Sequence, residues 1–354
     1  MQMTFRWYGK GNDCIPLKHI KQIPGVSGVV WSLHDMPAGE YWPMERIEEV
    51  KAQAAEYGLN IDVVESVNVH EDIKLGLPTR EKYIENYKNT LKNLGKAGVK
   101  VVCYNFMPVF DWTRTDLFKA LPDGSTALFY EKAKIDGIDP IKFMDQMSKQ
   151  EGLGTMPGWE PERLAKLKEL FVLYKDMTEE KLWDNLKYFL EAIIPVAEEA
   201  GIKMAIHPDD PPWNIFGLPR IITSKENLGK FLKLVDSPAN GLTLCSGSLG
   251  ASEKNNIPDI VRTYGDRIYF AHIRNVKRFE NGDFTEVSHR GCDGSLDIVE
   301  IVKAYHDIGY KYYVRPDHGR HIWDEKCRPG YGLYDRALGI MYMWGVWDTL
   351  EKNY

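Results

Sequence analysis

Short runs rich in Val, Ile and Tyr alternate along this chain with longer segments of helical periodicity. Eight such runs occur, and nearly all of them are followed by a helical segment. The runs lack clean apolar–polar alternation, as is typical of parallel strands buried on both faces. Strands that alternate with helices indicate βαβ units, and eight of them predict a (β/α)8 barrel, the TIM-barrel architecture. The predicted strands are 5–8, 25–33, 60–66, 99–106, 202–208, 241–247, 267–275 and 310–318.

The helical segments support the same α/β architecture. A proline near the start of 43–59 and a glycine at the end of 79–98 are typical helix boundaries. A doubly wound sheet is disfavoured, because no predicted strand runs into a G-x-G-x-x-G turn. No repeat or linker divides the chain, so we expect residues 1–354 to form one domain. The predicted helices are 16–23, 43–59, 79–98, 178–201, 224–235, 255–265, 295–310 and 332–350.

One segment, about 107–178, is far longer than an ordinary βα loop. It follows the fourth predicted strand, so it should lie over the C-terminal face of the barrel. It contains Trp112, Arg114, Trp159 and a short helical pattern at 161–171. We therefore expect an insertion that folds over the barrel mouth as a lid. The alternative is that it only builds a contact between two subunits.

Composition indicates the cellular compartment of the protein and excludes some classes of binding partner. The five cysteines are odd in number and scattered, which fits a reducing compartment better than a disulfide framework. The first residues lack the apolar core of a signal peptide, and no apolar run is long enough to span a bilayer. The net charge is −6, and no basic stripe of the kind that binds nucleic acid is visible. We expect a cytoplasmic protein that binds neither membrane nor nucleic acid.

The residues at the ends of the predicted strands include most of the candidate metal ligands and catalytic groups. In a barrel of this kind, catalytic groups come from the C-terminal ends of the strands and face one central space. The last four ends supply two imidazoles, a thiol and a carboxyl group, which together are a ligand set for a divalent transition metal. The thiol argues against Mg²⁺ and Ca²⁺, whereas imidazole and carboxylate suit Fe²⁺, Mn²⁺ or Zn²⁺. The eight strand-end residues are Trp7, His34, Glu65, Asn105, His207, Cys245, His272 and Asp317.

Each of these four ligand residues also has an ordinary structural explanation. An isolated buried cysteine such as Cys245 usually packs as a small hydrophobic residue. A lone histidine at a strand end is usually hydrogen-bonded rather than a ligand, and Asp317 could cap a loop. Four ligand-type residues on four consecutive strand ends favour a metal site over four separate coincidences.

Three further residues stand at useful positions. Arg274 lies two residues after His272, on the same strand face, where it could clamp a carboxylate with two hydrogen bonds. A surface salt bridge is the alternative for Arg274. His318 and Tyr334 are candidate acid and base groups near the metal, although Tyr334 could also be core packing.

The chain resembles the D-mannonate dehydratases of hexuronate breakdown, a metal-dependent family of the xylose-isomerase-like barrel group. The resemblance spans almost the whole chain and rests on long motifs such as YNFMPVFDWTR, MAIHPDDPPW, TLCSGSLG, AHIRNV, RPDHGR and PGYGLYDRALG. It implies conversion of D-mannonate to 2-dehydro-3-deoxy-D-gluconate and water, with Mn²⁺ or Fe²⁺, in glucuronate catabolism. The family's metal residues correspond to His207, Cys245, His272 and Asp317.

The same motifs contain the expected substrate and catalytic residues. His318, Tyr334 and Arg274 are the expected catalytic residues, and Arg274 is expected to bind substrate as well. The other expected substrate-binding residues are Asn105, Trp112, Arg114 and Arg315. The roles of His318 and Tyr334 as acid or base are not distinguished by the sequence.

Other functions remain open at this point. A metal-dependent sugar isomerase or epimerase on the same barrel would move hydrogen without losing water, and usually uses more carboxylate ligands. A non-catalytic sugar-acid sensor would bind the substrate without turnover. An abasic-site endonuclease is disfavoured by the acidic charge balance. The expected partner is therefore a small sugar acid, and we expect a homodimer because two-fold dimers are the commonest oligomers.

Overall fold

The computed structural model describes residues 1–143 and 167–353. Eight parallel strands close into a barrel in the order β1-β12-β9-β8-β7-β4-β3-β2, which confirms the predicted TIM barrel. Each strand overlaps one of the predicted runs, and β1 is bonded to both β2 and β12, so the first and last strands close the barrel. The strands are β1 (Gln2–Arg6), β2 (Val26–Trp31), β3 (Asn60–Glu65), β4 (Val101–Tyr104), β7 (Lys203–Ile206), β8 (Asn240–Cys245), β9 (Ile268–Ile273) and β12 (Tyr313–Pro316).

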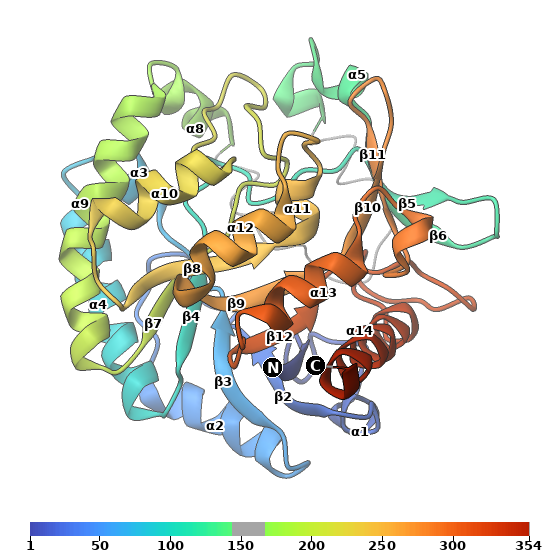
Figure 1. Cartoon of the computed structure of the whole chain (residues 1–354). Coiled ribbons are helices and arrows are strands. Elements are labelled where there is room, and N and C mark those ends of the chain that lie inside the picture. Colours follow the sequence, from blue (N-terminus) through green and yellow to red (C-terminus); the bar gives the residue numbers. More distant parts are fainter. Residues whose placement is uncertain (144–166, 354) are drawn as a thin grey trace.

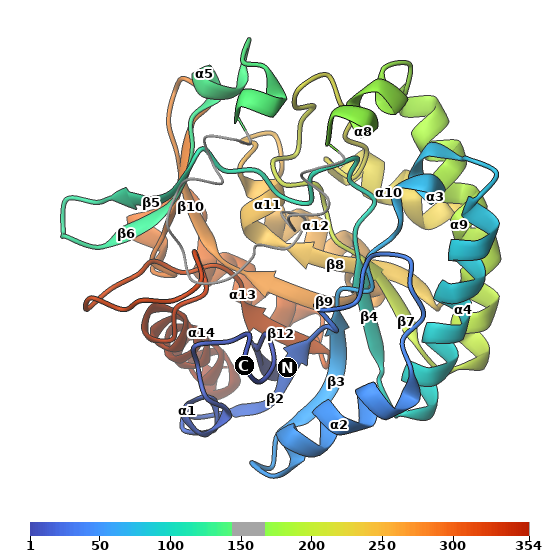
Figure 2. The same ribbon diagram turned by 180° about the vertical axis from the view of Figure 1, so that it is seen from behind.

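Helices surround the barrel, as Figures 1 and 2 show from opposite sides. They cover it with apolar stripes: α9, for example, buries Leu182, Leu186, Phe189 and Ile193 at helical spacing. The side chain of Thr178 caps α9 by accepting a hydrogen bond from the Lys181 amide. The predicted helices correspond to α1 (Leu17–Lys21), α2 (Met44–Ala55), α4 (Arg80–Lys96), α9 (Glu179–Glu199), α10 (Lys225–Leu234), α12 (Ile257–Tyr264), α13 (Ile298–Asp307) and α14 (Tyr334–Asn353).

A second sheet lies beside the barrel mouth, and the sequence did not predict it. Its four antiparallel strands have the order β10-β11-β6-β5. Two of them belong to the long segment after β4, and the other two form a hairpin after β9 (Figures 1 and 2). The sheet therefore joins two parts of the chain that are far apart in sequence. Its strands are β5 (Asp116–Ala120), β6 (Thr126–Tyr130), β10 (Asn275–Arg278) and β11 (Phe284–Val287).

The rest of the long segment contains α5 (Lys132–Ile135) and α8 (Leu167–Tyr174). The helical pattern predicted at 161–171 is present from Leu167 onward, and its earlier part lies outside the described residues. Trp159 also lies outside them. The start of the segment is anchored to α3, because the Lys74 ammonium group donates a hydrogen bond to the Met107 carbonyl at 2.7 Å.

Two local features differ from the sequence-based expectation. The predicted strand 241–247 ends at Cys245, and the Ser/Gly-rich stretch after it forms the short helix α11 (Ser246–Gly250), which Cys245 caps by accepting a hydrogen bond from the Ser248 amide. Cys14 and Cys327 form a disulfide pair that links the loop after β1 to the loop before α14, which the cysteine spacing did not predict. The remaining short elements are α3 (Glu71–Leu75) and the 3-10 turns η1 (Gly265–Arg267) and η2 (Gly291–Asp293).

Across residues 1–143 and 167–353, none of the helices has both the length and the apolar character needed to cross a membrane.

Candidate active site

Four ligand-type side chains meet at the carboxyl ends of four neighbouring barrel strands. His207 follows β7, Cys245 ends β8, His272 lies in β9, and Asp317 follows β12. One ligand atom from each lies within 4.8 Å of all the others. Strand register explains this proximity, because Cys245 pairs directly with His272 across β8 and β9. The structure thus brings together the four residues that the strand-end argument selected.

The spacing within this group suits a metal ion. His207 Nε2 lies 3.2 Å from His272 Nδ1, and Cys245 Sγ lies 3.4 Å from Asp317 Oδ2. Two ligand atoms on opposite sides of a shared ion, each bound at about 2.2 Å, are about 4.4 Å apart, so this group can close around one ion. Imidazole, thiolate and carboxylate together are typical ligands of a divalent transition metal.

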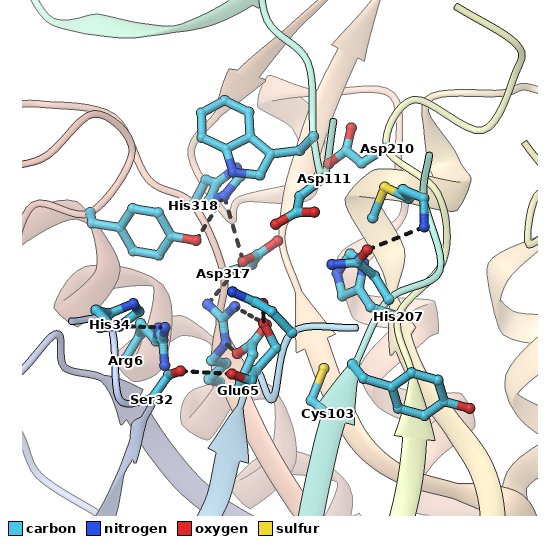
Figure 3. Close-up of a pocket in the computed structure, with 18 of the residues that line it drawn as sticks. Arg6, Ser32, His34, Glu65, Cys103, Asp111, His207, Asp210, Asp317 and His318 are labelled. Carbon is cyan, nitrogen blue, oxygen red and sulfur yellow. Dashed lines mark hydrogen bonds and ion pairs between the residues drawn. The ribbon is translucent and has the colours of Figure 1, made fainter. Parts of the chain in front are cut away.

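A pocket opens above this group and encloses about 650 Å³ of empty space, part of it open to solvent. Figure 3 looks into it: His207 lies on one side, and Arg6 and His34 lie on the other. Six of the predicted site residues line the pocket: Asn105, Trp112, His207, Arg315, Asp317 and His318. Cys245 and His272 are fully buried beside them. Arg114, Arg274 and Tyr334 are not among the lining residues.

Arg274 is completely buried in a network of ion pairs. Its guanidinium pairs with Glu286 at 2.7 Å and with Asp317 at 3.2 Å, and it also contacts Asp210. Its carboxylate partners thus come from the protein itself, which differs from the expected role as a clamp for a substrate carboxylate. Sequence periodicity placed Arg274 on the correct strand face, but it gave no sign of Glu286, which arrives from β11 of the second sheet.

Arg114 is held in the same network. It makes two hydrogen bonds to Asp210, at 2.7 and 3.2 Å, and one to Glu286 at 2.8 Å. Burial alone would raise the pKa of Asp210, but the charges of Arg114 and Arg274 outweigh it and hold that pKa far below the usual range. Arg114 therefore fixes the wall of the pocket and does not reach into it, in contrast to the expectation that it binds substrate.

Arg315 lines the pocket but is also paired. It binds both carboxylate oxygens of Glu65, at 2.9 and 3.0 Å, and it lies 2.9 Å from Asp317 Oδ1. Glu65 Oε1 in turn lies 3.4 Å from His272 Nε2, the ring nitrogen that faces away from the ligand group. A carboxylate on that nitrogen fixes the orientation of a metal-binding imidazole.

Tyr331, and not Tyr334, reaches the pocket from the PGYGLYDR motif. Tyr334 is 42% exposed, and its ring centroid lies 5.4 Å from that of Trp323, at the start of α14. Tyr331 is only 6% exposed, and its hydroxyl lies 3.1 Å from His318 Nε2. The expectation that Tyr334 lies near the metal is therefore corrected. The signal that distinguishes the two tyrosines is the helix boundary: Tyr331 belongs to the loop at the barrel mouth, where TIM barrels carry their chemistry.

Burial, together with the neighbouring Tyr8, raises the pKa of Tyr331 well above its usual value, so its hydroxyl keeps its proton at neutral pH. His318 Nδ1 lies 3.3 Å from Glu286 Oε1 and 2.5 Å from the Arg274 guanidinium. The imidazole is thus held between Tyr331 on one nitrogen and the buried ion-pair network on the other. This arrangement provides a proton donor and a proton acceptor within one hydrogen bond of each other.

Sequence reasoning missed other lining residues as well. At the end of β1, Trp7 was named, but Arg6 and Tyr8 line the pocket, because successive strand residues point to opposite faces. Asp210 lies in the HPDD motif three residues after His207, so its position was detectable. Nothing in the sequence marked Glu286.

The family model described as D-mannonate dehydratase (UxuA) matches residues 1–354. A mannonate dehydratase of Endomicrobium trichonymphae is 77% identical over 99% of this chain and 97% of that protein. Mannonate dehydratase 1 of Halalkalibacterium halodurans is 66% identical over 100% of this chain and 98% of that protein. The crystal structure of mannonate dehydratase from Streptococcus suis serotype 2 is 47% identical, covers 99% of this chain and 94% of its own, and superposes with a TM-score of 0.89.

Proposed function

This chain belongs to the D-mannonate dehydratase family, and we infer from that membership that it is a hydro-lyase that eliminates water from D-mannonate. The product of this elimination is 2-dehydro-3-deoxy-D-gluconate. The observation that carries the inference is the match over the full length of the chain at 77% identity, together with the ligand group at the barrel mouth.

We propose that His207, Cys245, His272 and Asp317 hold one divalent ion, either Mn²⁺ or Fe²⁺. Such an ion, when bound, acts as a Lewis acid that stabilises negative charge on substrate oxygens. Two observations support this assignment. The four ligand atoms are close enough to share an ion, and Glu65 is placed to orient His272 from the far side of its ring.

The protein's own residues account for the proton transfers. The C2 proton of an aldonate is a very weak acid, because it lies beside an already ionised carboxylate. A base must remove it, and an acid must protonate the departing C3 hydroxyl group. We assign the donor to Tyr331, whose buried hydroxyl is protonated, and the base to His318. The buried network of Arg274, Glu286 and Asp210 keeps His318 in place and makes the surroundings of the reacting carbons rigid.

The direct test of this function is an assay of product with defined metal content. Protein stripped by a chelator should be inactive on D-mannonate, and added Mn²⁺ or Fe²⁺ should restore turnover. The product should react as a 2-keto-3-deoxy acid in the semicarbazone and thiobarbiturate assays. A sugar isomerase or epimerase would not yield this product, and a sensor would bind D-mannonate without consuming it. Absence of a 2-keto-3-deoxy acid with either ion would refute the proposed function.

We further propose a cytoplasmic homodimer that acts in glucuronate catabolism. The substrate is a product of hexuronate breakdown, and Cys103, Cys245 and Cys292 are free thiols, as is usual in a reducing compartment. The Cys14–Cys327 pair is the feature that argues against this compartment. A dimer is supported by α14, which exposes Tyr334, Leu338 and Met341 at helical spacing on one face.

We also propose that residues 107–178 form part of the single barrel domain and act as a rim or lid. Support comes from the start of the segment, because Asp111 and Trp112 line the pocket. The Thr113 amide is held by the Asp210 carbonyl at 3.1 Å, so the segment is tied to the loop after β7. Exclusion of water strengthens the electrostatic interactions that stabilise developing charge.

Hydrogen exchange tests this lid. In Tyr331→Phe protein, which should bind D-mannonate and consume it only slowly, we expect amides within 107–116 to gain protection when the substrate is added. Peptides from α9 lie on the outside of the barrel and serve as an internal reference. If amides within 107–116 have the same protection with and without substrate, the segment is scaffold and not a lid.

A further inference from the structure

Among the residues that the structure describes, three buried arginines on the β1 side of the pocket have no carboxylate within ion-pair distance. They are Arg6, Arg328 and Arg336, which surround Tyr8 and Tyr331. Arg336 donates to the carbonyls of Tyr331 and Gly332, and Arg328 donates to the Asn12 carbonyl at 3.2 Å. Within residues 1–143 and 167–353, none of the three makes an ion pair. This contrasts with Arg114 and Arg315, which each pair with two carboxylates, and with Arg274, which pairs with three.

Of these three, only Arg6 lines the pocket. Its guanidinium donates to the Val30 carbonyl at 3.3 Å and lies 3.1 Å from His34 Nε2 and 4.6 Å from the centre of the Tyr8 ring. A guanidinium has five N–H donors, so these two protein acceptors leave donors available for a ligand. Figure 3 shows Arg6 and His34 together on the side of the pocket opposite His207.

Among the described residues, no carboxylate lies within ion-pair distance of these three guanidinium groups, although Glu65 and Asp13 act on Arg6 and Arg336 from farther away. Burial lowers the pKa of His34 well below its usual value, and the charges of Arg6 and Arg328 lower it further, so the ring is neutral. Burial lowers the pKa of Arg336 to about 10, which still leaves it charged at neutral pH. The oxygens of Asp13 accept hydrogen bonds from the amides of Tyr8 and Ile15, and the carboxylate of Glu65 is paired with Arg315.

A buried positive charge without a partner is costly, and an anion that enters the pocket relieves this cost. D-Mannonate carries one anionic group, its carboxylate. Four carboxylates line the pocket, namely Glu65, Asp111, Asp210 and Asp317. Of these, Glu65, Asp210 and Asp317 are already paired with Arg114, Arg274 or Arg315. Among the described residues that line the pocket, Arg6 is therefore the arginine whose charge no carboxylate offsets at ion-pair distance.

We propose that Arg6, supported by His34, is the subsite for the carboxylate of the substrate. This inference rests on the proposed function, and it assigns to Arg6 the role that sequence reasoning gave to Arg274. It also fixes the direction of the sugar chain. The Tyr8 ring packs edge-on against Tyr331 with centroids 5.0 Å apart, so C2 and C3, the carbons next to the carboxylate, lie beside Tyr331.

The test compares D-mannonate with D-mannonamide, in which an uncharged amide replaces the carboxylate. Binding is measured by calorimetry on metal-loaded protein in the Tyr331→Phe background, in which D-mannonate is expected to be consumed at least about 100-fold more slowly. We expect Arg6→Gln to weaken D-mannonate binding by about 10- to 100-fold and to leave D-mannonamide binding unchanged. In otherwise native protein, the KM for D-mannonate should rise by a similar factor, with a smaller change in kcat.

Two variants keep the test interpretable. Arg46→Gln changes an exposed arginine that pairs only with Asp35 and Glu49, and it should leave both affinities unchanged. Arg6→Lys retains the charge but not the forked geometry, so D-mannonate binding should be intermediate between native and Arg6→Gln protein. It also covers the case in which Arg6→Gln does not fold, since Arg6 donates to the neighbouring strand β2.

The outcomes separate this proposal from the proposed function. Equal losses of D-mannonate and D-mannonamide binding in Arg6→Gln, or no loss of either with the metal retained, would overturn the carboxylate subsite. If Arg6→Gln does not fold, native affinity for D-mannonate in Arg6→Lys overturns it. Failure of native protein to form a 2-keto-3-deoxy acid refutes the dehydratase function, whereas the difference between the two ligands still decides the subsite.

Discussion

Cys245→Ser protein should be purified without its divalent metal and should turn over D-mannonate at least about 10³-fold more slowly than native protein. The hydroxyl of serine is a poor ligand for a transition metal compared with a thiolate. Several kcal/mol of charge stabilisation depends on the ion, and each ~1.4 kcal/mol is a factor of ten in rate. Asp317→Asn should have a similar effect, because it replaces a charged ligand with a neutral one. Metal content by elemental analysis and turnover by product assay measure both losses.

The fold should survive these substitutions. The barrel buries a large apolar core and does not need a metal to hold it together, so circular dichroism should stay near native. Cys292→Ser is the matched control, because Cys292 is a free, exposed cysteine that should not affect metal content or turnover. Cys245→Ser protein that lacks metal and retains native turnover would contradict the assignment, as would protein that retains stoichiometric metal.

Tyr331→Phe should lower kcat by about 10²- to 10⁴-fold, the usual contribution of a positioned acid or base. Its hydroxyl is the buried group that contacts His318, and phenylalanine removes that hydroxyl while keeping the ring. Tyr334→Phe is the matched control from the same motif and should leave kcat nearly unchanged, because Tyr334 is exposed and outside the pocket. Steady-state kinetics on metal-loaded protein measures both.

Isotope exchange then distinguishes the two proton-transfer roles. If Tyr331 is the donor and His318 the base, Tyr331→Phe protein in D₂O should still exchange the C2 proton of D-mannonate while losing little water from it. His318→Asn protein should do neither. Loss of C2 exchange in Tyr331→Phe would instead make Tyr331 the base, and a normal kcat would remove it from the chemistry.

The barrel and the ligand group could be predicted from local sequence patterns for one shared reason. Parallel strands buried on both faces give apolar runs, and the residue that ends each run is brought to the mouth by the fold itself. His207, Cys245, His272 and Asp317 therefore needed no knowledge of long-range contacts. The structure confirms the barrel and brings these four residues together.

The residues that the sequence did not reveal depend on long-range pairing. Glu286 reaches Arg114 and Arg274 because β11 pairs with β6 from the long segment, and these strands are short and lie far apart in the chain. Arg274 was expected to bind the substrate carboxylate because nothing in the sequence indicated that Glu286 would pair with it. Tyr334 was named instead of Tyr331 because the sequence did not fix where α14 begins. The helix begins at Tyr334, so Tyr331 belongs to the loop before it and lines the pocket.

Closure of the barrel by β1 and β12 has a consequence for how the enzyme is synthesised. The ribosome produces His207, Cys245 and His272 in that order, and Asp317 only after the strand that closes the barrel. A nascent chain that ends before β12 has two imidazoles and a thiol but no carboxylate in this group. Such a set favours soft ions. The proposed ligand group is therefore complete only when translation is almost finished. If this group holds Mn²⁺ or Fe²⁺ as proposed, the carboxylate that suits these ions is the last of its ligands to be synthesised.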